Sequence, residues 1–214
     1  IAGATIGSFM CVLWLIALPA WAASESEKVI LVFGDSLSAG YGMGMEQSWP
    51  ALLQERLRDH GLKLRVENAS ISGETTSGGL RRLAALLKRH NPGIVVVELG
   101  ANDGLRGISI NEIDKNFRRI LNQITRAGAA ILLLEMRIPP NYGPKYSGQF
   151  VELYSRLEES YDLQLVPFFL HDVILDRRMM QADGLHPNAL AQPKMLENVW
   201  VYLTDEIYRN RQGD

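Results

Sequence analysis

The sequence predicts a three-layer α/β/α sandwich, in which helices cover both faces of one parallel sheet. Two observations carry this prediction. From Glu27 onward, short apolar runs alternate with amphipathic stretches, which is typical of strands that are connected by helices. Most of the apolar runs are also unbroken, and strands of that kind are buried on both faces, as they are in parallel sheets.

Five segments are predicted to be strands. Four of them are continuous runs rich in Val, Ile and Leu, whereas the second alternates apolar and polar residues. In chain order they cover residues 28–33, 63–67, 94–99, 130–135 and 163–168. We expect the strand order 2-1-3-4-5, which is the flavodoxin-like arrangement. Ligands of such sheets bind beyond the carboxyl ends of the strands, so polar residues at those ends are candidates for a functional site.

Four helices are predicted from apolar residues that recur every three or four positions. In chain order the stripes are Trp49, Leu52, Leu53 and Leu57; Leu80, Leu83, Ala84 and Leu87; Ile113, Phe117, Ile120, Leu121 and Ile124; and Leu196, Val199, Trp200, Leu203 and Ile207. We interpret these stripes as core. A further helix is expected to start at Pro187, since proline is favoured at the first helical position.

The composition indicates a single globular domain, which we assign to residues 24–214. The chain has 214 residues, of which 47% are hydrophobic and 21% are charged, as in ordinary globular proteins. The net charge is −2 and no basic block is present. Binding to nucleic acid requires clustered Lys and Arg, so a nucleic-acid partner is not expected.

Residues 1–23 are predicted to be a secretory signal peptide. They contain no charged side chain, and an apolar centre is followed by Pro19 and the small residues Ala20 and Ala22. This pattern predicts cleavage near Ala22 or Ala23 and a periplasmic or secreted protein. The chain begins with Ile1 and no Lys or Arg precedes the apolar run, so we expect its recorded start to be incomplete. The alternative is an uncleaved membrane anchor, since more than about 18 uncharged residues can span a bilayer.

The single cysteine, Cys11, lies within this segment. After cleavage the domain would have no thiol, which excludes a cysteine nucleophile, a thiolate metal site and a disulfide. A histidine metal site is not expected either, because His60, His90 and His171 share no short motif.

Polar residues follow the predicted strands in separate blocks. The first strand leads into "GDSLS" with Ser36, the third into "GAND" with Asn102, and the fifth into "ADGLHPN" with Asp183 and His186. Each block alone has an ordinary explanation as a turn or a helix cap. Together they supply a nucleophile, a base, a carboxylate that can orient the base, and amide donors at one edge of a sheet.

Two other interpretations of the first block fail on spacing. Gly40, Gly42 and Gly44 are spaced G-x-G-x-G and begin seven residues after the strand, whereas a dinucleotide site needs G-x-G-x-x-G directly after it. Neither a phosphate-binding G-x-x-x-x-G-K-[ST] loop nor the G-x-S-x-G elbow of α/β-hydrolases occurs in the sequence.

These blocks together resemble the SGNH hydrolases, also called GDSL esterases. The named residues of that superfamily correspond here to Ser36, Gly73 in "NASISGETT", Asn102 and His186. Longer stretches such as "GDSLSAGYGM" and "MMQADGLHPNALAQP" resemble its multifunctional thioesterases, arylesterases and lysophospholipases from the periplasm of Gram-negative bacteria. The resemblance covers nearly all of the domain and implies a flavodoxin-like SGNH fold with no cofactor.

The resemblance implies a serine hydrolase mechanism. Ser36 would be the nucleophile, His186 the general base and then acid, and Asp183 the residue that orients the imidazole. The backbone N–H groups of Ser36 and Gly73 and the amide of Asn102 would form the oxyanion hole. Asp35 and Asp103 also flank these positions, but we expect them to bond loop amides, because only Asp183 is three residues from His186.

The expected substrate is a small-molecule acyl ester or thioester. Apolar residues of the surrounding loops are candidates for an acyl groove, namely Leu105, Ile138, Pro139 and Tyr142. Two alternatives remain open: an O-acetyl carbohydrate esterase of the same superfamily, and a non-catalytic ligand-binding module. We expect a monomer without a stable membrane anchor once the signal peptide is removed.

Overall fold

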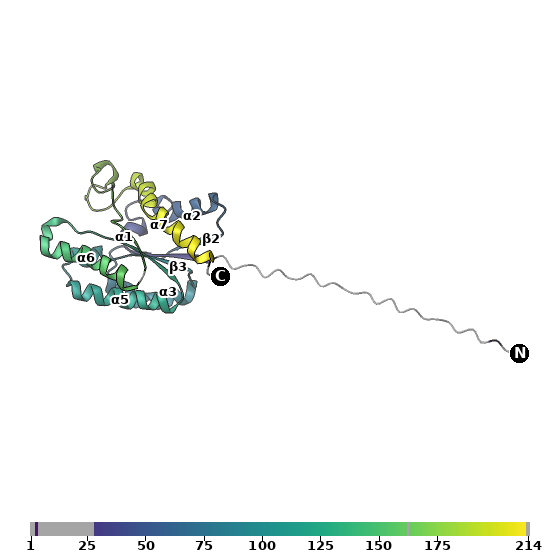
Figure 1. The fold of residues 1–214 in the computed structure, drawn as a ribbon. Coiled ribbons are helices and arrows are strands. Elements are labelled where there is room, and N and C mark those ends of the chain that lie inside the picture. The colour runs from purple at the N-terminus through teal and green to yellow at the C-terminus, as the bar shows by residue number, and fades with distance from the viewer. Residues whose placement is uncertain (1–2, 4–27, 162, 213–214) are drawn as a thin grey trace.

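A computed structural model describes Gly3, residues 28–161 and residues 163–212. Five parallel strands form one sheet in the order β2-β1-β3-β4-β5, and helices lie on both of its faces (Figure 1). The strands are β1 (Lys28–Gly34), β2 (Leu64–Asn68), β3 (Ile94–Glu98), β4 (Ala130–Leu134) and β5 (Gln164–Val166). The predicted fold class and strand order are therefore confirmed.

The apolar strands are buried as their sequence predicts. In the two central strands, Val32 is paired with Val96, and neither side chain is exposed. The largest difference from the prediction is in β5, which ends at Val166 instead of residue 168. Pro167 follows it, and a proline has no N–H with which to continue the ladder. The third strand ends at Glu98 because the chain turns at Gly100, where φ is +106°.

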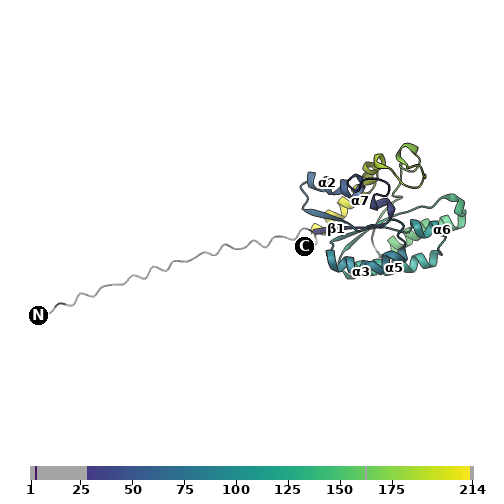
Figure 2. The ribbon, with the colours of Figure 1, turned by 180° about the vertical axis from the view of Figure 1, so that it is seen from behind.

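Helices cover both faces of the sheet (Figures 1 and 2). On one face lie α1 (Ser36–Ala39), α2 (Trp49–Asp59) and α7 (Gln192–Gln212). On the other lie α3 (Thr76–His90), α5 (Ile110–Arg126) and α6 (Pro144–Tyr161). The short helix α4 (Ala101–Leu105) directly follows β3.

The four predicted apolar stripes lie in α2, α3, α5 and α7 and face the core, with one exception. All five stripe residues of α5 are fully buried, whereas Ala84 of α3 is exposed. Helix α6 was not predicted, although Phe150, Leu153, Tyr154 and Leu157 are buried along it. Two prolines and a glycine lie just before this helix, and because of them the sequence was interpreted as a long loop.

The predicted signal peptide and Cys11 lie outside the described residues. Within the part of the chain that the structure describes, no helix is both long enough and apolar enough to cross a membrane.

Candidate active site

Ser36 lies at the carboxyl end of β1, where it is the first residue of α1. Asp35 caps this helix, since its Oδ1 accepts a hydrogen bond of 3.1 Å from the N–H of Leu37. Gly40 then ends the helix in the left-handed conformation with φ of +74°, which costs glycine little. The buried strand, the cap and the glycine together present Ser36 at the edge of the sheet.

Three side chains from two distant segments form a hydrogen-bonded chain at this edge. The Oγ of Ser36 lies 3.0 Å from Nε2 of His186, and the Nδ1 of His186 lies 2.7 Å from Oδ2 of Asp183. If Nδ1 carries the proton toward Asp183, Nε2 is an acceptor for the serine hydroxyl. The arrangement can therefore take a proton from Ser36.

The turn that carries His186 also holds Asp183 in its ionised form. Oδ1 of Asp183 accepts hydrogen bonds from the backbone N–H groups of His186 (3.0 Å) and Leu185 (2.9 Å). The N–H of His186, its ring and then the N–H of Leu185 lower the pKa of Asp183 to about 2. The side chain is 40% exposed, so it is charged and partly hydrated at neutral pH.

Two further contacts fix the position of His186. The ring of Tyr41 lies against the imidazole with 4.4 Å between the ring centres. Gln181 donates through Nε2 to the carbonyl groups of Tyr41 (2.7 Å) and Pro187 (3.0 Å). The predicted helix start at Pro187 is wrong. Asn188 instead caps a 3-10 turn, Ala189–Ala191, that leads into α7, because its side chain accepts from the N–H of Leu190.

The loop after β2 brings Gly73 toward the same edge. Ile71 N–H donates to the carbonyl of Gly34 at 3.1 Å, which ties this loop to the end of β1. Gly73 has φ of +78°, a conformation that favours glycine, and its carbonyl accepts from Nη2 of Arg106 at 2.9 Å. The N–H groups of Ser36 and Gly73 donate to no backbone carbonyl within the described residues.

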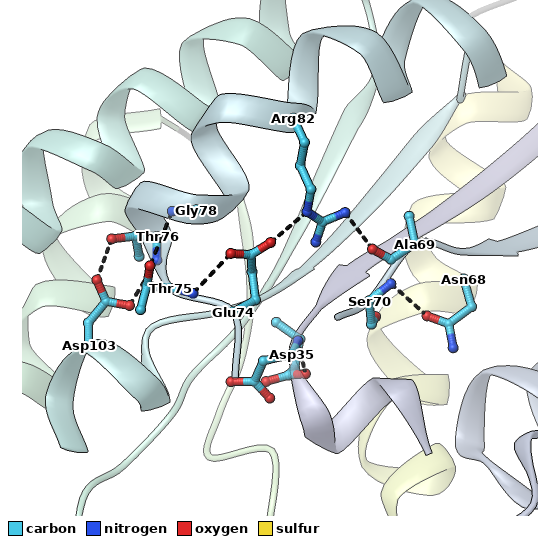
Figure 3. Close-up of polar contacts among 11 residues, drawn as sticks. Asp35, Asn68, Ala69, Ser70, Glu74, Thr75, Thr76, Gly78, Arg82 and Asp103 are labelled. Atoms are coloured by element: carbon cyan, nitrogen blue, oxygen red, sulfur yellow. Dashed lines mark hydrogen bonds and ion pairs between the residues drawn. The ribbon is translucent and has the colours of Figure 1, made fainter. Parts of the chain in front are cut away.

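Ionic contacts hold the Gly73 loop against α3 (Figure 3). Oε2 of Glu74 lies 2.6 Å from Nε of Arg82, and Nη1 of Arg82 donates to the carbonyl of Ala69 at 2.5 Å. The side chain of Glu74 is 11% exposed and that of Arg82 is 21% exposed. A charged pair with so little water around it fixes the loop more firmly than a surface pair does.

Asn102 is in the first turn of α4, and its side chain points back to the first strand. Its Nδ2 donates to Oδ2 of Asp35 at 2.8 Å, so one of its two N–H bonds is directed by that carboxylate. The neighbouring Asp103 instead accepts from the N–H (2.8 Å) and hydroxyl (2.6 Å) of Thr76. The expected bonds of Asp35 and Asp103 to loop amides are not what the structure shows, since Leu37, Asn102 and Thr76 lie in helices. Of these three aspartates, Asp183 is the one that contacts the histidine ring.

Asp35 lies beside a second buried carboxyl group, Glu98. The exposed fraction is 1% for Asp35 and zero for Glu98. Burial raises the pKa of Asp35 to about 6, although hydrogen bonds from Leu37, Glu98 and Asn102 oppose the rise. Burial and the adjacent charge of Asp35 raise the pKa of Glu98 well above its usual range. The sequence pattern did not single out Glu98, which looks like an ordinary strand end.

Of the four residues predicted to line an acyl groove, Leu105 ends α4, which follows β3, and the other three follow β4. Tyr142 donates through its hydroxyl to the carbonyl of Leu105 at 2.8 Å, so these two are in contact. Ile138 is buried and Pro139 is half-buried. Two surface pockets lie elsewhere, one beside Arg137 and Phe168 and one beside Ser109 and Tyr146.

The remaining histidines have structural contacts. The ring of His60 stacks on that of Trp200. Nδ1 of His90 lies 3.7 Å from Oε2 of Glu67, and Nδ1 of His171 lies 3.2 Å from Oδ2 of Asp172. Among the described residues, no three His, Cys, Asp or Glu side chains are grouped so that they could hold a metal ion.

Comparison with known proteins shows the family to which the chain belongs. Residues 32–192 match the model of the GDSL-like Lipase/Acylhydrolase family. The chain belongs to this family. The match spans every block discussed above, from Ser36 to His186, and confirms the resemblance inferred from the motifs.

Individual relatives are similar over most of their length. An arylesterase of Vibrio mimicus is 48% identical over 178 residues, which are 83% of this chain and 89% of the relative. The thioesterase 1/protease 1/lysophospholipase L1 of Escherichia coli is 46% identical over 181 residues, 85% of either chain. The crystal structure of the psychrotrophic esterase EstA from Pseudoalteromonas sp., inhibited by monoethylphosphonate, has a TM-score of 0.82 at 40% identity, covering 85% of this chain and 99% of EstA. The protein is accordingly a hydrolase of the carboxylic-ester class, as the motifs predicted.

Proposed function

We propose that Ser36 is the nucleophile of an ester and thioester hydrolase. Its Oγ attacks the acyl carbon while Nε2 of His186 takes the hydroxyl proton, and the same proton then goes to the leaving alcohol or thiol. A water molecule next attacks the acyl-serine, again through His186, and releases the carboxylic acid. Asp183 keeps the histidine in the required tautomer and stabilises the imidazolium while it exists.

The oxyanion would be bound by three donors. These are the backbone N–H groups of Ser36 and Gly73 and the second N–H of Asn102. Gly73 suits this role because it has no Cβ to obstruct the substrate and its carbonyl is held by Arg106. Donors that are already in place stabilise the charge that develops on the carbonyl oxygen without further rearrangement.

One observation carries the proposal: the unbroken chain from Ser36 through His186 to Asp183, with distances of 3.0 and 2.7 Å. Hydrogen bonds of this length allow direct proton transfer between nucleophile and base. The contact of Asn102 with Asp35, next to Ser36, brings an amide donor to the same edge of the sheet.

We further propose an acyl chain as the group that the site accepts, with Leu105, Ile138, Pro139 and Tyr142 beside it. The arylesterase and the thioesterase/lysophospholipase among the relatives support this class of substrate. Cleavage of residues 1–23 on export would place the enzyme in the periplasm or outside the cell, where envelope esters are accessible substrates.

A chain-length series of p-nitrophenyl esters, from acetyl to palmitoyl, tests the proposal, with Ser36→Ala as control. We expect the highest kcat/KM for chains longer than acetyl and a loss of roughly 10⁶-fold in kcat for Ser36→Ala. A strict preference for acetyl would instead favour a carbohydrate O-acetyl esterase. Absence of hydrolysis in the parent would favour a binding module, and near-parent activity of Ser36→Ala would remove Ser36 as the nucleophile.

A further inference from the structure

Glu98 connects the end of β3 to the turn that carries Ser36. Its Oε2 accepts hydrogen bonds from the N–H of Asp35 at 3.1 Å and from the hydroxyl of Ser38 at 2.8 Å. The indole N–H of Trp49 donates to the same hydroxyl at 3.1 Å. Glu98, Ser38 and Trp49 have no exposed surface, so bulk water does not reach this group.

The surroundings of Glu98 disfavour a negative charge. No Lys, Arg or His forms a salt bridge with it among the described residues, and its Oε1 has no hydrogen-bond donor beside it. Its Oε2 accepts from the N–H of Asp35, so the two carboxyl groups are neighbours in the core. Two carboxyl groups in contact cannot both be ionised without a large cost, and a fully buried carboxylate without a cation adds to that cost.

The hydrogen bonds of Asp35 favour a charge on that carboxyl group. Asp35 accepts from Leu37 and Asn102, one on each oxygen, and both favour its ionised form. Glu98 is fully buried, and burial with the adjacent charge of Asp35 raises its pKa well above the usual range.

We propose that Glu98 is a positioning residue of the oxyanion hole: its buried carboxyl group holds the N–H of Asp35, and the carboxyl group of Asp35 in turn orients the amide of Asn102. The inference rests on the proposed role of Asn102 as an oxyanion donor. Glu98 contacts neither the substrate nor Ser36 Oγ and acts only through its two neighbours.

The contacts that link Glu98, Asp35 and Asn102, which we call the relay, determine which way the amide of Asn102 faces. A carboxylate accepts only hydrogen bonds, so Asp35 selects the NH₂ end of the amide and leaves its second N–H for the substrate. Without the carboxyl group of Glu98, the N–H of Asp35 would lose its acceptor. Asp35 would then take up a proton or shift, and a protonated Asp35 no longer discriminates between the two ends of the amide.

Two substitutions of Glu98 separate this role from packing. Glu98→Gln retains a neutral donor together with an acceptor oxygen, whereas Glu98→Met has a similar volume without either. We expect Glu98→Gln to keep kcat within about threefold of the parent. Glu98→Met should lose roughly 10²-fold in kcat with little change in KM, as expected when an oxyanion donor is misplaced.

Glu135→Met is the matched control. Glu135 follows β4 as Glu98 ends β3, it is 6% exposed, and it pairs with Arg137 instead of the Ser36 turn. We expect this variant to be less stable but to retain the parent kcat. If Glu98→Met also keeps the parent kcat, or if Glu98→Gln loses as much as Glu98→Met, the proposal is overturned.

A double-mutant cycle with Asn102→Ala tests whether Glu98 acts through Asn102. We expect Glu98→Met to have no further effect on kcat once Asn102 is replaced, whereas additive losses would overturn the relay. If Asn102→Ala alone has the parent kcat, the oxyanion assignment fails and the relay with it. If Asn102→Ala is impaired and Glu98→Met is not, only the relay fails. Should Glu98→Met not fold, Asp35→Asn takes its place in the cycle, and additivity with Asn102→Ala is again the contradicting result.

Discussion

Asp183 and Asp35 each orient one side chain of the proposed active site, but they do so in opposite environments. Asp183 faces His186 from an exposed turn, accepts two backbone N–H groups and has a pKa of about 2. Asp35 faces Asn102 from the interior, lies against Glu98 and has a pKa of about 6. The same side chain is thus a charge stabiliser where water surrounds it, and part of a buried pair of carboxyl groups where water does not.

The two environments suit the different side chains that the two aspartates contact. His186 becomes an imidazolium during the reaction, so it needs a carboxylate that stays ionised. Asn102 stays neutral, so it needs only a fixed acceptor. Asp35, whose N–H is bonded to the buried Glu98, supplies that acceptor.

The largest effect is expected at the histidine that Asp183 serves. His186→Ala should lower kcat roughly 10⁶-fold, because Nε2 of His186 is the group that lies within hydrogen-bond distance of Ser36 Oγ among the described residues. Hydrolysis of p-nitrophenyl butyrate measures this loss. His171→Ala is the control, since its ring pairs only with exposed Asp172, and it should keep the parent kcat. A loss below tenfold in His186→Ala would contradict the assignment.

Asp183→Asn should have the next largest effect. The asparagine disfavours the required tautomer of His186, and we expect a loss of roughly 10²- to 10⁴-fold in kcat. We expect a loss in the lower part of this range, because the Asp183 side chain is 40% exposed and water can replace part of its interaction with the imidazole. Steady-state kinetics at pH 8 measures the loss, and an unchanged kcat would exclude Asp183 from the triad.

Asp35→Asn should cost less than Asp183→Asn. Asp35 touches Asn102 but not the reacting groups, so removing its charge can cost at most what loss of one oxyanion donor costs, roughly 10²- to 10³-fold. We expect about tenfold in kcat with KM unchanged. A loss larger than that of Asn102→Ala, measured on the same ester, would show that Asp35 has a more direct role.

The two aspartates should also have opposite effects on stability as pH changes. The pKa of Asp35 is raised from 3.8 to about 6, so the folded protein holds this proton more tightly than the unfolded chain. Its ionisation therefore destabilises the fold as pH rises from about 4 to 6, by on the order of 3 kcal/mol. The pKa of Asp183 is lowered, so its contribution to stability is present above pH 4 and is lost as pH falls toward 2.

Thermal unfolding of Asp35→Asn and Asp183→Asn against the parent checks these signs. The Tm of Asp35→Asn relative to the parent should rise between pH 4 and 6. The relative Tm of Asp183→Asn should rise as pH is lowered from 4 to 2, because the parent loses a contribution that the variant lacks. Parallel curves for both variants would show that the environments of the two aspartates do not differ as described.

The contact between Asp183 and His186 could be predicted from the sequence, whereas the pairing of Asp35 with Glu98 could not. Asp183 and His186 are three residues apart in one turn, so short-range geometry brings them together. Ser36 could be placed at the strand end because the apolar run before it is continuous. The pairing of Asp35 with Glu98 depends on the register of β1 and β3, which sets Gly34 opposite Glu98. That register is a tertiary property that no local motif encodes.

Two other features were missed for similar reasons. Tyr41 packs on His186 across 145 positions of sequence, and a tyrosine in a glycine-rich turn has no distinguishing pattern. Helix α6 was missed because Pro139, Pro140 and Gly143 precede it and Pro144 is its first residue. A proline at a helix start and a proline in a loop cannot be distinguished until the packing of Phe150 and Tyr154 is known.

Covalent labelling of Ser36 tests the central claim most directly. The parent, Ser36→Ala and His186→Ala are treated with a fluorophosphonate, and intact mass and peptide mapping locate the adduct. We expect one adduct on the parent, carried by the peptide that contains Ser36, none on Ser36→Ala and very slow labelling of His186→Ala. Labelling of the parent at another residue, or equal labelling of Ser36→Ala, would contradict the account.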